Sequence, residues 1–315
     1  MSEITLVTAY FDINRKNWSG FERDSNKYIN YFKFWAKIKN RLIIFTQAQF
    51  YEELYNIRKS FGLEKETQIV IINNPIDCNK NLYMKMKKVM QNELAINFHF
   101  YKETKRPEVW RTDYNYITCL KFYLVYKAVN DFNLKNTVAW IDFGFNHGGN
   151  DGLINTEEFS FLWNYNFSPK IHLFSYKKID IDRPIFDIVR SLDVYIRGNI
   201  MIAPSHLWPI FYQLTNDAML SLLRCGFCDD DQTIELMAYK EKPELFEIHD
   251  IDFWYEGLSK FSNQKFTIKQ QEIPKNKVYA DYRYKFRIFF NSGNYQLAWK
   301  YLKKYLKYKI RDSSI

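Results

Sequence analysis

The chain has 315 residues and a net charge of +9, with 47% hydrophobic and 26% charged side chains. This composition predicts a packed core and argues against disorder. No apolar run approaches the roughly 20 residues of a membrane span, and the N-terminus lacks the basic start of a signal peptide. The isolated C-G-F-C pair at 225–228 favours reduced thiols over a zinc site. We therefore expect a cytoplasmic protein.

The excess positive charge lies at the C-terminal end. From Lys265 onward there are 13 basic and 3 acidic residues, whereas the rest of the chain is nearly balanced. Such an asymmetry indicates that this end meets an anionic surface.

In the first half, β-branched apolar runs alternate with amphipathic helical patterns. The pattern predicts strands at 4–10, 41–46 and 68–72, and helices near 26–39 and 50–61. This alternation predicts right-handed crossovers and a parallel sheet with helices on both faces.

The second half continues with helices and shorter strands. We expect helices near 79–97, 114–132, 207–224 and from about 228, and strands at 137–141, 171–176 and 194–203. The Gly/Asn-rich segment 143–169 is typical of an active-site loop. The last fifty residues predict a helical pair joined at 291–294. The expected organisation is therefore an α/β domain over 1–260 and a basic helical region over 261–315.

Asp142 follows the strand at 137–141 and precedes a glycine-rich loop. In an open parallel sheet the ligand crevice lies at this edge, where an acid can meet the metal ion of a bound phosphate. The alternative is an aspartate that only forms a turn.

Three consecutive carboxylates, Asp229, Asp230 and Asp231, begin a predicted helix. One of them can cap the helix, but capping does not require three. Adjacent carboxylates repel each other, which raises at least one pKa, as a general base requires.

Three weaker candidates remain. Gly198 interrupts an apolar strand, which indicates either close approach of a ligand or a bulge. His249 near a strand end can ligate a metal, whereas His172 has no convergent partner in the sequence. The loop after the first strand offers Thr8, Asp12 and Arg15; a carboxylate there can bind a base or ribose and an arginine can bind diphosphate.

Four segments together resemble a known family. They are T-A-Y-F-D-I-N-R-K-N-W at 8–18, the aromatic helix containing Tyr28, Tyr31, Phe34 and Trp35, W-I-D-F-G at 140–144, and D-D-Q at 230–232. The resemblance is to the HtrL/YibB family, linked to lipopolysaccharide or lipooligosaccharide assembly, and it covers residues 4–249. It implies a GT-A-like, Rossmann-type mixed sheet flanked by helices, and a glycosyltransferase that uses a nucleotide-sugar donor, of which we favour the UDP form.

The resemblance also implies roles for individual residues. The donor side comprises Thr8, Ala9, Tyr10, Asp12, Arg15, Lys121, Asp142, Phe143 and Gly144. The acceptor side comprises Gly198, Asn199 and Gln232, with Asp230 as the preferred base and Asp231 next.

A divalent metal, Mn²⁺ or Mg²⁺, is expected at Asp142. The usual D-x-D pattern is absent because Gly144 stands two residues later. A second ligand would have to be Asn146, His147, Asp151 or His249, and His249 is the one we favour.

Around 299–310, Trp299, Leu302 and Leu306 recur at helical spacing between lysines. Such a basic amphipathic helix can dock on the inner face of the membrane, near a lipid-linked glycan acceptor; packing on the body is the alternative. A nucleotidyl- or phosphotransferase is the competing enzyme class. Binding of nucleic acid is not expected, because no recognised motif is present and the body is neutral.

Overall fold

The structure is a computed structural model that describes residues 4–269 and 277–312. The chain divides into two compact units, Met1–Lys269 and Gln270–Ile315. Within the described ranges, every helix falls short of the length and hydrophobicity that a membrane span requires.

The first unit is built on one seven-stranded sheet in the order β3-β2-β1-β4-β6-β5-β7. Its strands are β1 (Ile4–Tyr10), β2 (Leu42–Thr46), β3 (Thr67–Ile71), β4 (Thr137–Ile141), β5 (Ile171–Ser175), β6 (Ile200–Pro204) and β7 (Phe246–Asp250). β1 pairs in parallel with β2 and β4, and β2 with β3, as the alternating first half predicts. β6 runs antiparallel to β4 and β5, so the sheet is mixed.

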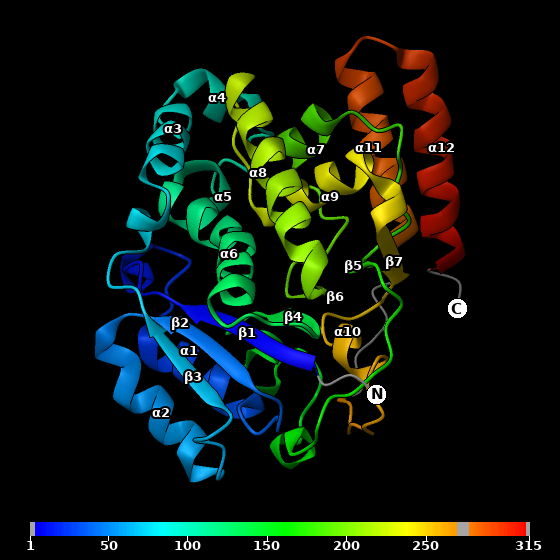
Figure 1. Ribbon diagram of the computed structural model, residues 1–315. Helices are drawn as coiled ribbons and strands as arrows, with labels where there is room; N and C mark the ends of the chain where they lie inside the picture. The colour runs from blue at the N-terminus through cyan, green and yellow to red at the C-terminus, as the bar shows by residue number, and fades with distance from the viewer. Residues whose placement is uncertain (1–3, 270–276, 313–315) are drawn as a thin grey trace. The chain divides into compact units, whose positions relative to one another are not determined.

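Helices cover both faces of this sheet (Figure 1). They are α1 (Ser25–Trp35), α2 (Tyr51–Ser60), α3 (Lys80–Met90), α4 (Glu93–Phe98), α5 (Pro107–Trp110), α6 (Thr112–Asp131), α7 (Ile185–Ser191), α8 (Trp208–Arg224), α9 (Asp231–Glu241) and α10 (Glu256–Ser259). The predicted α/β class, a Rossmann-type mixed sheet flanked by helices, is confirmed.

Alternation along the strands produces two cores, one on each face. Val7 and Trp140 belong to the core beneath α3, α6, α8 and α9, whereas Leu6 and Ile141 belong to the core beneath α1 and α2. Successive strand residues point to opposite faces, and both faces of β1 and β4 are buried. This burial explains why both strands are almost continuously apolar.

Some predicted elements differ from the structure. The helix expected at 79–97 is broken at Gln91, and Asn92 caps the separate helix α4 by accepting from the Leu94 amide. The strand expected at 194–203 begins only at Ile200, after an isolated bridge at Ile196. The local sequence did not predict α7.

The second unit is a pair of helices, α11 (Lys277–Asn291) and α12 (Tyr295–Asp312). They are joined at Gly293, whose φ of +75° lies in the left-handed region that glycine adopts without strain. The predicted C-terminal helical pair is confirmed.

Candidate functional site

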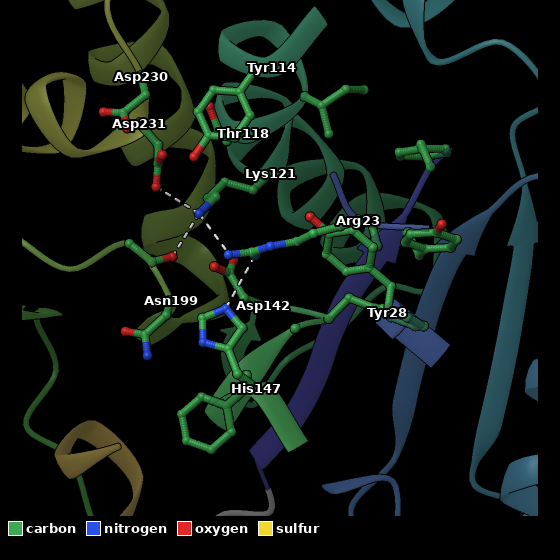
Figure 2. A pocket seen from close by; sticks show the side chains of 18 of the residues that line it. Arg23, Tyr28, Tyr114, Thr118, Lys121, Asp142, His147, Asn199, Asp230 and Asp231 are labelled. Carbon is green, nitrogen blue, oxygen red and sulfur yellow. Dashed lines mark hydrogen bonds and ion pairs between the residues drawn. The ribbon is translucent and has the colours of Figure 1, made fainter. Parts of the chain in front are cut away.

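A cavity of about 330 Å³ lies where β1 and β4 end, with the N-terminus of α9 on its other side (Figure 2). Of the residues expected at the site, it is lined by Ala9, Tyr10, Asp12, Arg15, Lys121, Asp142, Phe143, Gly144, Gly198, Asn199, Asp230, Asp231 and Gln232. Thr8 and His249 do not line it. Residues from five separate chain segments therefore meet in one place.

Lys121, on α6, joins the two acidic parts of this cavity. Its Nζ lies 3.2 Å from Asp142 Oδ1 and 2.8 Å from Asp231 Oδ2, and it donates to the Gly198 carbonyl at 2.7 Å. An ammonium group has three N–H donors, so all of them are used. We expected Lys121 to bind diphosphate; the structure places it as a buried bridge whose three donors have protein partners.

Asp142 is held in a fixed orientation. Its Oδ1 accepts from Lys121 and also from the Trp140 indole nitrogen at 2.6 Å, and its backbone amide donates to the Asn199 carbonyl at 2.9 Å. The Asp142 side chain is 40% exposed. One carboxylate oxygen is therefore anchored, and Oδ2 remains for a ligand in the cavity.

The three consecutive aspartates have three different environments. Asp229 accepts from the Thr233 hydroxyl and the Asp230 amide, and burial raises its pKa to about 7. Asp230 caps α9 by accepting from the Gln232 amide at 3.2 Å. Among the described residues, Asp231 forms an ion pair with Lys121, whereas Asp229 and Asp230 feel the charge of Arg106 without an ion-pair contact.

The pKa values of the two cavity aspartates differ for this reason. Burial, together with Asp231 and Asp229, raises the pKa of Asp230 well above its usual range. Burial also raises the pKa of Asp231, but Lys121 opposes that rise. Burial alone would lower the pKa of Lys121, but Asp142, Asp231 and Glu235 together raise it. Lys121 thus favours the ionised form of Asp231, and no such ion pair with a described residue opposes the rise at Asp230.

Gly198 lies against this ion pair. A Cβ at Gly198 would stand 1.9 Å from Asp231 Oδ2 and 2.9 Å from Glu235 Oε1. Glu235 is fully buried, and both its carboxylate oxygens lack a hydrogen-bond partner among the described residues. Gly198 therefore marks close approach by side chains of α9, a third possibility beside the ligand and the bulge expected from the sequence.

The loop after β4 brings His147 into contact with Arg23, a residue that the sequence analysis did not assign to the site. Asn146, His147 and Gly148 all adopt left-handed φ values, which turns the loop sharply. This turn places His147 Nδ1 2.7 Å from Asp151 Oδ2, and His147 Nε2 3.4 Å from the Arg23 guanidinium. Figure 2 shows Arg23 extending from the β1–α1 loop toward Asp142 and His147.

Aromatic rings surround the β1 end of the cavity. Tyr10 stacks on Phe143 at a centroid distance of 4.9 Å and lies 5.4 Å from Tyr28. Arg15 donates to the Tyr28 hydroxyl at 2.9 Å, and its guanidinium lies 5.4 Å from the Tyr114 ring. This wall combines flat apolar surface with a positive charge.

The opposite wall is built around Asn199, whose side-chain amide donates to the Trp254 carbonyl at 2.8 Å. Trp254 lines the cavity and is 38% exposed. Its ring and that of Tyr176 each lie 4.2 Å from the buried Arg197 guanidinium. Asn199 is therefore anchored to a segment whose tryptophan ring packs on the buried Arg197.

His249 lies far from Asp142. It sits on β7, which is separated from β4 by β6 and β5, a distance of about 14 Å at the usual strand spacing. Asp142 and His249 therefore cannot share one ion. Among the described residues, a cluster of three His, Cys, Asp or Glu side chains with metal-ligand spacing is found at His172, Glu247 and His249, away from the cavity.

Comparison with known proteins identifies the family. The model of the family described as "Bacterial protein of unknown function (HtrL_YibB)" matches residues 2–263. Protein HtrL of Escherichia coli is 31% identical over 291 residues, covering 86% of this chain and 97% of the relative. The chain belongs to the HtrL/YibB family.

Among solved structures, the apo form of mouse xyloside xylosyltransferase 1 is similar to this HtrL/YibB protein. The match has a TM-score of 0.39 and 11% identity, and it covers 81% of this chain and 90% of the other. A TM-score of this size is too low to support an inference about activity.

Proposed function

We propose that the chain is a GT-A type glycosyltransferase. It would transfer a sugar from a nucleoside diphosphate donor, preferably a UDP-sugar, to a bacterial surface glycan such as lipopolysaccharide, lipooligosaccharide or capsule. The observation that carries the proposal is that one cavity contains both the acid after β4 and the acids before α9, with Lys121 joining them. Transfer of a sugar needs a place for the departing diphosphate next to a base for the acceptor.

The donor fits the wall at the β1 end. The half-buried Tyr28 ring lines the cavity and offers a flat surface for a nucleobase, while the buried rings of Tyr10 and Phe143 pack behind it. Arg15 and Arg23 both line the cavity, and a guanidinium binds phosphate oxygens through paired hydrogen bonds. Arg23 is thus the residue proposed to bind the donor diphosphate, which we expected Lys121 to bind.

A divalent cation fits the donor side through Asp142. Mg²⁺ is commonly held by one or two carboxylates together with substrate phosphates, and Asp142 keeps Oδ2 available while Lys121 and Trp140 hold Oδ1. The ion would neutralise charge on the leaving diphosphate. Asp142 is thus the proposed protein ligand, and His249 is removed from that role.

We propose Asp231 as the general base that takes the proton of the acceptor hydroxyl. Lys121 favours its ionised form, whereas Asp230 serves as the helix cap and forms no ion pair with a described residue. A base must be ionised before it acts. The order of preference between the two is thereby reversed.

Nucleotide binding tests the donor site. We expect UDP to raise the melting temperature and to bind at one site, with the larger effect in the presence of Mn²⁺. Arg23→Gln should weaken UDP binding by about 10- to 100-fold, since a hydrogen bond to a charged group contributes about 1.5–3 kcal/mol. Calorimetric titration measures the change.

Arg224→Gln is the matched control, because Arg224 is exposed at the end of α8 and does not line the cavity. Equal UDP affinity in the two variants, or no binding of UDP, GDP or CDP to the native protein, would contradict the donor site.

We also propose that α12 docks on the anionic cytoplasmic leaflet near a lipid-linked acceptor. Trp299 and Leu306 are 60% and 42% exposed, and Lys300, Lys303 and Lys307 are exposed around them. Replacing the three lysines with glutamine should weaken binding to phosphatidylserine vesicles by about 1 kcal/mol per lysine at low salt. Vesicle sedimentation measures it.

The same triple change at Lys85, Lys87 and Lys88, which are exposed on α3, removes equal charge elsewhere. An equal loss of vesicle binding in both triple variants would indicate that net charge alone drives binding, and would contradict the docking proposal.

A further inference from the structure

Three potential metal ligands share one face of the sheet at β5 and β7. In the parallel pairing of these strands, His172 stands opposite Glu247 and Phe174 stands opposite His249. Glu247 and His249 are two residues apart on β7, so their side chains project to the same side. His172 Nδ1 lies 2.8 Å from His249 Nε2, and these nitrogens lie 3.9 and 4.0 Å from the Glu247 carboxylate oxygens.

The hydrogen bond made by His172 Nε2 determines which nitrogen of His172 is available to a metal. His172 Nε2 lies 2.9 Å from the Ser168 carbonyl oxygen. A carbonyl only accepts, so Nε2 carries the proton, and Nδ1 accepts from His249 Nε2–H; a bound metal would take the place of that His249 proton. Ligating histidines characteristically donate their second N–H to a carbonyl or carboxylate in this way.

The Glu247 carboxylate is also held in place by a hydrogen bond, and apolar rings pack against the two histidines. The Ser168 hydroxyl donates to Glu247 Oε2. The Phe167 ring lies 4.8 Å from His172, and the Phe261 ring lies 4.5 Å from His249. One residue, Ser168, thus positions two of the three groups through its carbonyl and its hydroxyl.

We propose that His172, Glu247 and His249 form a binding site for Zn²⁺ or a similar divalent transition metal, separate from the sugar-transfer cavity. Two imidazoles and one carboxylate make a ligand set that zinc accepts, with water in the remaining position. None of the three residues lines the cavity. The site is therefore independent of the proposed activity.

Metal binding requires a small adjustment of the site. Two nitrogens bound to a tetrahedral zinc ion stand about 3.3 Å apart, given Zn–N bonds of about 2.0–2.1 Å. The observed separation of 2.8 Å would have to widen, and the more distant carboxylate would have to move in. The Glu247 side chain is 43% exposed, which leaves it room to do so.

The position of the site indicates a structural role. β7 is the last strand in the sheet order and pairs with β5. His172 lies on β5, and the other two ligands lie on β7. A bound ion would therefore cross-link the edge strand to its neighbour.

Zinc titration of the full chain, without nucleotide, tests the proposal. The native protein should bind one Zn²⁺, and Co²⁺ in its place should show the absorption bands of four- or five-coordinate cobalt. Glu247→Gln and His249→Gln should each weaken Zn²⁺ binding at least tenfold and remove those bands.

His206→Gln is the matched control, because His206 is exposed and lies outside the cluster; it should bind Zn²⁺ like the native protein. Circular dichroism verifies that each variant is folded, and Glu247, at the partly exposed position, is the variant least expected to disturb folding. Absence of stoichiometric Zn²⁺ binding to the native protein, or unchanged binding in the folded Glu247→Gln variant, would overturn the site.

Discussion

Replacing Lys121 with methionine is expected to destabilise the protein by about 3–5 kcal/mol, the usual cost of removing one partner from a buried ion pair. The Lys121 side chain is 4% exposed and its cation lies between Asp142 and Asp231. Without it, Asp231 would keep a buried charge with no cation. Urea denaturation at neutral pH measures the free energy of unfolding.

The loss should depend on pH in a defined direction. The folded-state pKa of Asp231 is already raised by burial, and removal of Lys121 raises it further. A raised carboxyl pKa costs stability in full above that pKa, and the cost declines as the pH falls from the folded-state pKa toward the lower, unfolded-state pKa. The Lys121→Met deficit should therefore shrink from pH 8 toward pH 5.

A control for this experiment lies on the same helix. Lys127 forms an exposed i,i+4 pair with Asp131 at 2.7 Å, and Lys127→Met should cost no more than about 1 kcal/mol. Adding Asp231→Asn to Lys121→Met should restore part of the stability, because it removes the unpaired charge. Equal effects at Lys121 and Lys127 would contradict the bridging role.

Gly198→Ala is expected to be the most damaging single-methyl change in the cavity, at about 3 kcal/mol, the upper end for overpacking. The new Cβ would come within 1.9 Å of Asp231 Oδ2, so that the acid has to move away from Lys121. We also expect sugar transfer to fall sharply, because the proposed base is displaced. Thermal unfolding measures the stability effect.

Gly144→Ala is the comparison, since Gly144 also lines the cavity but has φ of −85° and would make only ordinary contacts, the nearest at 3.6 Å from Tyr31. It should change stability by less than about 1 kcal/mol. Equal stability of the Gly198→Ala and Gly144→Ala variants would contradict the tight packing at Gly198.

The sequence predicted those parts of the fold that follow from local patterns. β1 and β4 lie at the residues expected, because an apolar β-branched run buried on both faces is a strong local signal. The expectation that Asp142 and the acids before Gln232 face one cavity also agrees with their placement. Asp142 follows the end of β4, and the acids before Gln232 stand at the start of α9. The topology of the sheet therefore determines where these side chains lie.

The sequence did not predict features that depend on long-range pairing. Lys121 and Asp231 are 110 residues apart, and no local pattern shows that the lysine's donors are all used internally. His172 and His249 are 77 residues apart and meet only through the register of β5 and β7. The sequence likewise did not predict the left-handed turn that brings His147 to Arg23, although the glycines of this segment suggested an active-site loop.

The most direct test of sugar transfer is incubation with a panel of nucleotide sugars, with separation of the released products by ion-exchange chromatography. We predict release of free nucleoside diphosphate, with the UDP-sugar preferred. We also predict a turnover about 10²- to 10⁴-fold lower in Asp231→Asn, while UDP affinity is retained. Release of pyrophosphate in place of nucleoside diphosphate, or full turnover in the Asp231→Asn variant, would contradict the account.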